Sequence, residues 1–282
     1  MGAASPKVPR MRTGFSRRDF LKLGSAALLS SALPRFARHS LELGPMLDEP
    51  FDPSVIYHGS RKVPSIAMTY DDCWHPEVLE QLVEMVKPYP VFHFTFFAIG
   101  EAIDIGEAVR PGIWRKLYEQ GHEIGYHTYH HDNPQTMALH TLESDLDQWM
   151  ATLSRVLGVW PTVHFARPPF DDLSLSFQEL CRKRGIVATL YSTGFESADM
   201  QESMRLASKA VNGDIVQMHT YQDPPHGRFD VDITAKVLPY LAQQGFTLVT
   251  MSQLYDVVLR ERYSSDGCDV AAGGAPTRTC LE

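Results

Sequence analysis

The chain has 282 residues, of which 44% are hydrophobic and 21% are charged, a composition typical of a folded globular protein rather than a disordered one. Its formal net charge of −8 disfavours nucleic acid as a partner, because an extended nucleic-acid surface requires a basic face. No run of about 18 apolar residues occurs, so we expect no stable membrane span in the mature protein.

The charge is unevenly distributed along the chain. Residues 1–38 contain eight Lys or Arg residues and one acid, so this segment carries +7 and the remainder carries −15. The pair Arg17-Arg18 precedes a modestly apolar stretch from Leu23 to Leu33. This arrangement resembles a twin-arginine export signal, and a basic amphipathic surface helix is the alternative. We therefore expect the twin-arginine machinery as a partner and a periplasmic, cell-envelope or secreted location.

Composition divides the chain into an export signal (1–38), a lead-in segment (39–64), a folded domain (65–263) and a flexible tail (264–282). Four cysteines are too few for a fold built on disulfides. Two of them, Cys268 and Cys280, lie in the tail. Whether they pair or remain free thiols stays open, because connectivity does not follow from sequence.

From Ser65 onward, short apolar runs typical of strands alternate with segments of helical period. The expected strands are Ser65–Tyr70, Val91–Ile99, His122–His127, Val163–Arg167, Ile186–Tyr191, Asp214–His219 and Thr247–Met251. The expected helices are Pro76–Val86, Pro111–Gln120, Leu142–Leu157, Ser174–Arg184, Met200–Val211 and Asp232–Gln244. Since the alternation contains no hairpin signal, it predicts an α/β fold with a parallel sheet. Periodicity alone leaves open whether that sheet is doubly wound or closed into a barrel.

Polar residues follow the carboxyl ends of several expected strands, where barrel active sites lie. Asp71 and Asp72 come directly after the first strand, so one can bind a cation while the other acts as a base. His127 and His131 are four residues apart, and a helical turn would point them the same way. Two imidazoles and a carboxylate form a three-ligand site for a divalent metal. Exposed loop acids and a His-rich surface loop are the alternatives.

Two further strands end in residues suited to catalysis. Arg167 precedes two prolines and can pair with an acid at the mouth, although a structural turn is equally consistent with this motif. His219 ends the sixth strand, and its position at the same end favours a general acid or base role. We expect His130 to face solvent or to support the site, and His122 to be structural.

Taken together, these motifs resemble the polysaccharide deacetylase family, also called carbohydrate esterase family 4 or the NodB-homology domain. The matching segments are Thr69–Asp72, Thr95–Gly100, Gly121–Thr128, the His-Thr-x-x-His motif from His127 to His131, the Arg-x-Pro-aromatic motif from Arg167 to Phe170, and Val216–His219. The resemblance covers about Pro64 to Arg262, with order and spacing preserved. It implies a distorted (β/α)7–8 barrel with parallel strands.

The resemblance also implies a function. The protein would be an exported, metal-dependent hydrolase that removes acetyl groups from an N- or O-acetylated glycan. Asp72, His127 and His131 would bind one divalent metal ion, with zinc expected before cobalt, nickel or manganese.

The family's catalytic roles carry over to the matching residues of this chain. Asp71 would be the base that deprotonates a metal-activated water, and Arg167 would orient Asp71. His219 would be the acid that protonates the leaving amine. The backbone amide of Phe170 would stabilise the oxyanion, and further substrate or oxyanion contacts are expected from Tyr70, Cys73 and Trp74.

Three positions depart from the family pattern. Cys73 replaces a glycine, and Phe170 stands where tyrosine is common. The fifth strand lacks the usual Asp–Trp motif, and Asp199 lies at the wrong spacing to replace it. This last departure favours a second hypothesis, a metal-dependent amidase or imidase acting on a small amide. A third hypothesis is a non-catalytic glycan-binding protein, although the expected ligands and base are all present.

Overall fold

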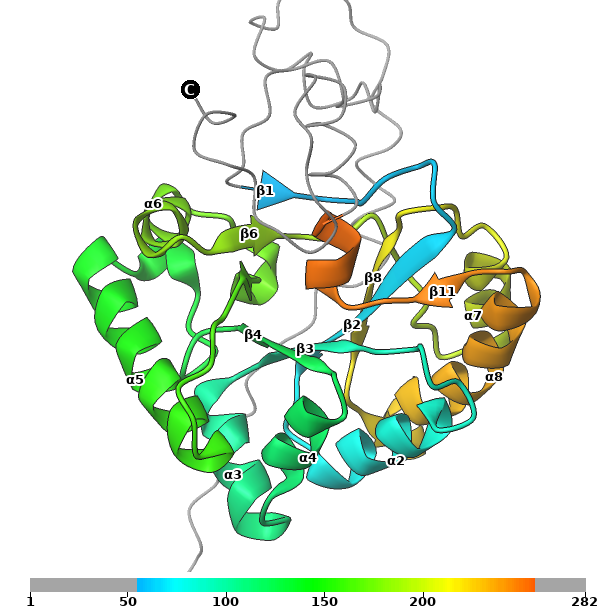
Figure 1. Ribbon diagram of the computed structural model, residues 1–282, viewed down its shortest axis with the longest axis horizontal. Coiled ribbons are helices and arrows are strands. Elements are labelled where there is room, and N and C mark those ends of the chain that lie inside the picture. The colour runs from blue at the N-terminus through cyan, green and yellow to red at the C-terminus, as the bar shows by residue number, and fades with distance from the viewer. Residues whose placement is uncertain (1–54, 257–282) are drawn as a thin grey trace, which may run out of the picture. The chain divides into compact units, whose positions relative to one another are not determined.

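A computed structural model describes residues 55–256 of the chain (Figure 1). The expected export signal, most of the lead-in segment, and the tail with Cys268 and Cys280 lie outside the described residues. The strands of the main sheet are β1 (Val55–Ile56), β2 (Ser65–Asp72), β3 (Thr95–Ala98), β4 (Glu123–Tyr126), β5 (Phe165–Ala166), β6 (Val187–Thr189), β7 (Thr193–Gly194), β8 (Ile215–His219) and β11 (Thr247–Leu248).

Within residues 55–256, these nine strands form one sheet in the order β1-β6-β5-β4-β3-β2-β8-β7, with β11 beside β2. Its strand pairings are all parallel. The two ends of the order, β1 and β7, do not pair in this part of the chain, and an isolated bridge between His58 and Asp214 lies at this opening. The expected α/β fold, a distorted barrel with parallel strands, is confirmed.

Helices cover the outside of the sheet. They are α2 (Pro76–Val86), α3 (Gly100–Val109), α4 (Ile113–Glu119), α5 (Leu139–Leu157), α6 (Leu175–Arg184), α7 (Met200–Ala207) and α8 (Asp230–Gln243). Figure 1 shows them around the strands, from α6 and α5 through α3, α4 and α2 to α8 and α7. Short 3₁₀ helices are η3 (Pro134–Thr136), η4 (Pro169–Asp171) and η5 (Pro224–His226). No helix in the described range is both long and apolar enough to cross a membrane.

β2 is the central strand of the sheet and is buried along most of its length. Seven of its eight residues are buried, as expected for a strand that is covered on both faces. It pairs with β8 on one edge and with β3 and β11 on the other. The central strand therefore delivers its last two residues, Asp71 and Asp72, between neighbouring strand ends.

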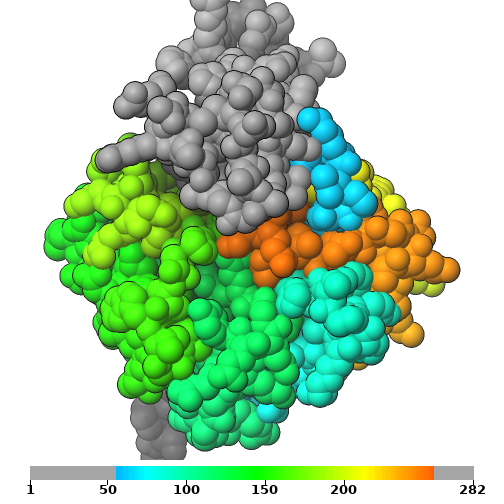
Figure 2. Space-filling view, viewed as in Figure 1, coloured from blue at the N-terminus to red at the C-terminus, as the bar shows by residue number. Residues whose placement is uncertain are grey.

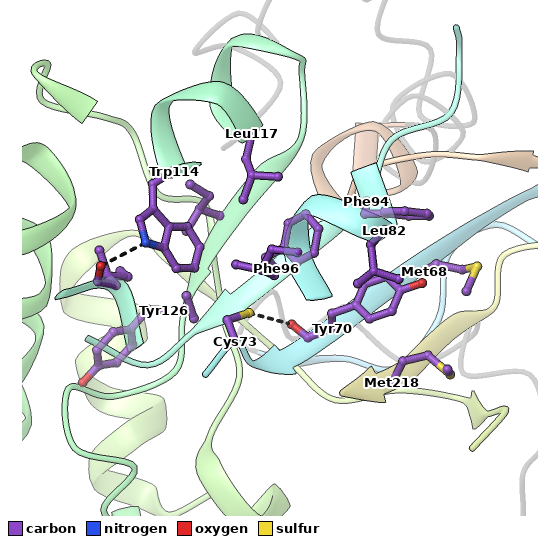
Figure 3. Close-up of a cluster of buried hydrophobic side chains, with 14 of the residues drawn as sticks. Met68, Tyr70, Cys73, Leu82, Phe94, Phe96, Trp114, Leu117, Tyr126 and Met218 are labelled. Atoms are coloured by element: carbon purple, nitrogen blue, oxygen red, sulfur yellow. Dashed lines mark hydrogen bonds between the residues drawn. The ribbon is translucent and has the colours of Figure 1, made fainter. Parts of the chain in front are cut away.

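The largest part of the core lies between the sheet and the outer helices (Figure 3). Tyr70 of β2 packs there against Phe94 and Phe96, with ring centroids 5.1 and 5.6 Å away. Its hydroxyl forms a 2.9 Å hydrogen bond with Thr234 of α8. Full burial of one such apolar side chain contributes about 1.5–3 kcal/mol to folding. This contact joins the central strand to a helix near the end of the described chain.

The seven expected strands are all present, but most are shorter than predicted. The run Val91–Ile99 pairs as a strand only over Thr95–Ala98, because its earlier residues curve past β11, where the His93 N–H donates to the Leu248 carbonyl. The predicted helix from Pro111 begins only at Ile113, after Gly112 with a φ of 83°. Apolar composition thus identifies each element, and the backbone partners set its ends.

Sequence periodicity missed α3, β1, β7 and a small antiparallel ribbon. The ribbon consists of β9 (Gln222–Asp223) and β10 (Arg228–Phe229), joined through η5. The expectation of no hairpin is therefore wrong for this segment, whose Pro-Pro-His-Gly connection lacks the usual two-residue turn signal. α3 was missed because it contains two glycines and begins at one of them.

The first and last described segments lie side by side, as their blue and orange colours show in Figure 2. Gly59 follows β1, and a Cβ atom there would lie 2.5 Å from Cγ of Leu254. Any side chain at this position would displace the side chain of Leu254.

Candidate metal and catalytic site

The parallel register aligns the carboxyl ends of four strands. Asp71 of β2 pairs with His219 of β8, and Tyr126 of β4 pairs with Ala166 of β5. The residues that follow β4 and β5, His127 and Arg167, therefore emerge at neighbouring positions. Segments separated by up to about 150 residues in sequence meet here because parallel strands place like ends at one edge.

Asp72, His127 and His131 converge on one point. Oδ1 of Asp72 lies 3.5 Å from Nε2 of His127 and 3.3 Å from Nε2 of His131. Three donor atoms of this set lie within 4.8 Å of one another. Two ligands that share a tetrahedral zinc ion at about 2.0–2.1 Å are about 3.3 Å apart. The spacing therefore fits a small divalent cation.

Two further observations support a cation at this point. Oδ1 of Asp72 is buried and has no hydrogen-bond partner, which is costly for a carboxylate oxygen. Nδ1 of His127 donates to the Arg167 carbonyl at 2.7 Å, so the other ring nitrogen, Nε2, faces Asp72 and can act as a metal ligand. Lone pairs on a carboxylate and an imidazole then face the same space. A bound metal ion would satisfy both.

The loop that carries the two histidines is not the helical turn expected from their spacing. Thr128 and His131 have φ values of 57° and 61°, so two left-handed residues bring the rings together. The first N–H groups of α3 donate to the carbonyls of Thr128 and Tyr129. Asp145 of α5 accepts from the Tyr129 N–H at 2.9 Å. Two helices therefore hold the backbone of the histidine loop.

Asp71 is buried and held by donors on both of its oxygens. Nη1 of Arg167 donates to Oδ1 at 2.7 Å, and Nε2 of Gln217 donates to Oδ2 at 2.9 Å. The guanidinium of Arg167 is fully buried and lies 4.2 Å from the centroid of the Phe97 ring. The Arg167 pairing that the sequence left open is therefore made with Asp71.

His219 forms its principal contact with Glu196, a residue that the sequence analysis did not identify. Its Nδ1 donates to the Glu196 carboxylate at 2.9 Å, and its backbone N–H donates to the same group. Burial alone would lower the pKa of His219, but the hydrogen bond and charge of Glu196, with the charges of Asp71 and Asp72, raise that pKa to about 10. The imidazole is therefore protonated at neutral pH.

A cavity of about 300 Å³ opens over these groups. It is lined by Asp71, Asp72, His127, His131, Pro168, Phe170, Asp171, Gln217 and His219. The ring of Phe170 is 62% exposed and its centroid lies 4.6 Å from that of His131. Base, acid and metal-ligand candidates thus share one solvent-accessible space.

Backbone strain is concentrated around this cavity. Among the described residues, six non-glycine positions have positive φ: Asp72, Cys73, Thr128, His131, Phe170 and Asp171. All lie at the end of β2 or in the segments that follow β2, β4 and β5. Each left-handed residue costs about 1 kcal/mol or more, and such strain is typically found at functional sites.

Three predicted contact residues are not brought to the cavity. Tyr70 and Cys73 are fully buried in the core on the other side of β2, where Figure 3 shows both side chains. The alternation of side chains along a strand turns Tyr70 away from the face that bears Asp71. Trp74 is half-buried and does not line the cavity. Tyr70 and Cys73 therefore do not line the cavity in this structure.

The other predicted histidines occupy the expected places. His130 is exposed and lies 2.8 Å from Glu101, outside the convergent set. His122 is buried and accepts the Phe94 N–H, and burial lowers its pKa to about 4. Asp199 caps α7 by accepting the Gln201 N–H and takes no part in the site.

Glu196, Gln217, Asp171 and Tyr191 form the polar surroundings that sequence motifs did not reveal. Glu196 lies two residues after β7, in the segment that lacks the Asp–Trp motif, and its strand-end position was the available signal. Tyr191 donates to Asp171 at 2.8 Å on the same side of the cavity. This segment thus supplies a carboxylate partner for His219 that the sequence did not predict.

Comparison with known proteins agrees with this arrangement. The polysaccharide deacetylase family pattern matches residues 58–189. The chain is 29% identical over 196 residues to a peptidoglycan-N-acetylglucosamine deacetylase of Bacillus cereus. The aligned region covers 67% of this chain and 87% of that protein. It is 25% identical over 193 residues to a bifunctional xylanase/deacetylase of Pseudobutyrivibrio xylanivorans. That alignment covers 68% of this chain and 30% of the other protein.

A solved structure shows the same fold. A CE4-family pseudoenzyme from Bacillus anthracis superposes with a TM-score of 0.62, covering 73% of this chain and 70% of that chain at 19% identity. The family pattern spans the strands that bear Asp71, Asp72, His127 and Arg167. The family match, these relatives and the shared fold confirm the predicted resemblance to the polysaccharide deacetylase family.

Proposed function

We propose that this protein is an exported, metal-dependent deacetylase that acts on an N- or O-acetylated cell-wall or extracellular glycan. The observation that carries the proposal is the convergence of an Asp-His-His donor set, the buried carboxylate of Asp71 and the imidazole of His219 on one cavity. The relatives named as peptidoglycan deacetylases support a glycan substrate. The Arg17-Arg18 pair supports export.

Asp72, His127 and His131 would hold the metal ion. When bound, such an ion supplies Lewis acidity towards the acyl carbonyl and makes water a stronger acid. The protein itself orients the ligands: the Arg167 carbonyl fixes the His127 ring, and α3 and α5 fix the loop that bears His131.

Asp71 is the proposed base. Arg167 and Gln217 hold its carboxylate in one orientation beside the cavity, where it can accept a proton from water. The backbone N–H of Phe170 is the proposed oxyanion donor, in a loop whose left-handed residues turn towards the cavity.

His219 is the proposed acid. Glu196 accepts the proton of Nδ1, so Nε2–H remains available to protonate the leaving amine. The role of Glu196 is to keep the ring charged and in a fixed orientation. A protonated imidazole beside the cavity is what cleavage of an amide requires, because an unprotonated amine anion is a poor leaving group.

The metal and the reaction are tested together. We expect the purified wild-type protein to contain one divalent metal per chain and to release acetate from peptidoglycan or N-acetylglucosamine oligomers. His131→Ala should lose both, because two remaining ligands bind a metal weakly. Metal content by elemental mass spectrometry and acetate release are the measurements.

His130→Ala is the matched control, since His130 is a neighbouring exposed histidine that pairs with Glu101. It should retain metal and activity. Full metal occupancy in His131→Ala would contradict the ligand assignment. A metal-loaded wild type without acetate release would contradict the deacetylase proposal.

A small amide or imide is the second candidate substrate. The observation in its favour is the polar wall formed by Asp171 and Gln217 next to a fifth strand without the Asp–Trp motif. Small amides in the same substrate panel distinguish the two. A non-catalytic role is disfavoured because base, acid and donor set are all present.

A further inference from the structure

Tyr221 contacts Asp72, one of the three candidate metal ligands. It does so on the side of the carboxylate that faces away from His127 and His131. Its hydroxyl donates to Oδ2 of Asp72 at 2.8 Å. The other oxygen, Oδ1, is the buried atom without a hydrogen-bond partner that lies 3.3–3.5 Å from the two histidine Nε2 atoms. The two oxygens of this carboxylate therefore have distinct partners: a phenol on one side and the donor set on the other.

The phenol is itself held in place by groups outside the donor set. The Tyr221 N–H donates to Oδ2 of Asp230 at 2.9 Å, and its carbonyl accepts the Asp230 N–H at 3.0 Å. The guanidinium of Arg228, from the β9–β10 ribbon, lies 4.8 Å from the centre of the Tyr221 ring. The position of the hydroxyl is thus set by α8 and the ribbon.

The carboxylate of Asp72 needs such a partner. Asp72 has a φ of 69° and is the last paired residue of β2, so its neighbours along the chain do not fix which oxygen faces the histidines. A charge-assisted hydrogen bond to Oδ2 removes the alternative in which this oxygen rotates into the donor set. Within residues 55–256, the Tyr221 hydroxyl forms its hydrogen bond with Asp72.

We propose that Tyr221 is a positioning residue for the metal site, holding Asp72 so that it binds the ion through Oδ1 alone. This inference rests on the proposed metal-dependent function. Groups that orient a metal ligand from behind typically change metal affinity by about 10–100-fold when they are removed. The β9–β10 ribbon, a segment that sequence periodicity missed, thereby becomes part of the support of the site.

The test compares two Tyr→Phe variants of the full protein, each of which removes one hydroxyl. Tyr221→Phe removes the bond to Asp72. Tyr191→Phe removes a bond of the same length, 2.8 Å, to a cavity carboxylate outside the donor set, Asp171. Zinc affinity is measured by competition with a chromophoric chelator. We expect about a 10–100-fold loss for Tyr221→Phe and no loss for Tyr191→Phe.

A second readout remains informative if Tyr221→Phe is less stable. The rise in Tm on addition of zinc is measured against the metal-free form of the same variant, so a general loss of stability cancels. This rise should be smaller in Tyr221→Phe than in the wild type and unchanged in Tyr191→Phe.

The outcomes separate this inference from the proposed function. Wild-type zinc affinity in Tyr221→Phe, with His131→Ala unable to bind, would overturn the role of Tyr221 and leave the metal site intact. Equal losses in both phenylalanine variants would also overturn it, because the effect would then belong to the cavity as a whole. If His131→Ala binds zinc as well as the wild type, the proposed function itself fails.

Discussion

The proton on His219 depends on one carboxylate. Glu196 accepts from both the ring and the backbone of His219, and with the two aspartates of β2 it raises the pKa of the imidazole to about 10 against the opposing effect of burial. An acid catalyst acts only in its protonated form. The proposed reaction should therefore persist to alkaline pH and decline as the pH rises through the raised pKa.

Replacing Glu196 by Gln should shift that decline to lower pH. The substitution removes a negative charge beside the imidazolium, so the pKa of His219 falls towards its ordinary value of 6.5. We expect the alkaline limb of the kcat/KM profile to move down by about one to three pH units, with a smaller change near pH 6. Initial rates on an N-acetylated substrate between pH 5 and pH 11, at about half-unit steps, measure it.

Asp199→Asn is the control for this experiment, because Asp199 lies in the same segment but caps α7. Its alkaline limb should match that of the wild type. An unchanged limb in Glu196→Gln would deny His219 the role of acid.

At the residue scale, sequence predicted the groups that sit in recognisable motifs at strand ends. Asp71, Asp72, His127, His131, Arg167 and His219 all lie where such motifs place them. Glu196 and Tyr221 were missed because they lie on loops, and loop paths are not encoded in apolar periodicity. Tyr70 shows the opposite error, because it was predicted to contact substrate. Neighbouring residues of a strand point to opposite faces, so Tyr70 points away from the face that bears Asp71.

At the scale of elements, α5 is tied to the histidine loop through one buried acid. Asp145 accepts the hydroxyl of Tyr126 from β4 and the N–H of Tyr129. Burial raises the pKa of this carboxyl, so its retention in the interior depends on these donors. Helix, strand and loop therefore share one polar contact beneath the metal-ligand candidates.

Asp145→Ala should reduce the free energy of unfolding by about 2–4 kcal/mol, since it leaves a buried hydroxyl and a buried amide without an acceptor. Asp147→Ala, on the exposed side of the same helix, should change it by less than about 0.5 kcal/mol. Urea denaturation followed by circular dichroism measures both. Similar stability of the two variants would show that the contact of Asp145 is not a stabilising one.

Elements with strong apolar periodicity were predictable and elements defined by pairing were not. α2 matches its predicted bounds because Pro76 opens it and apolar residues recur on one face. β1 and β7 have two residues each, and they are strands only because β6 and β8 lie beside them. Two residues carry no period, so pairing between distant segments cannot be derived from them.

At the scale of the whole molecule, the basic leader and the acidic remainder support the proposal of export in a folded state. The Arg17→Lys, Arg18→Lys double variant should leave unprocessed precursor in the cytoplasm, because the machinery reads the arginine pair and not its charge. Cell fractionation and immunoblotting measure the distribution. Changing Arg10 and Arg12 to Lys in the same way is the control and should leave export intact. Normal export of the Arg17→Lys, Arg18→Lys variant would indicate another route.

The contact between Gly59 and Leu254 has a consequence for how this fold can be used. Residues near the two ends of the described range therefore lie next to each other. A unit with neighbouring entry and exit points can be inserted into a loop of a host protein, or joined to other modules, without stretching its own sheet.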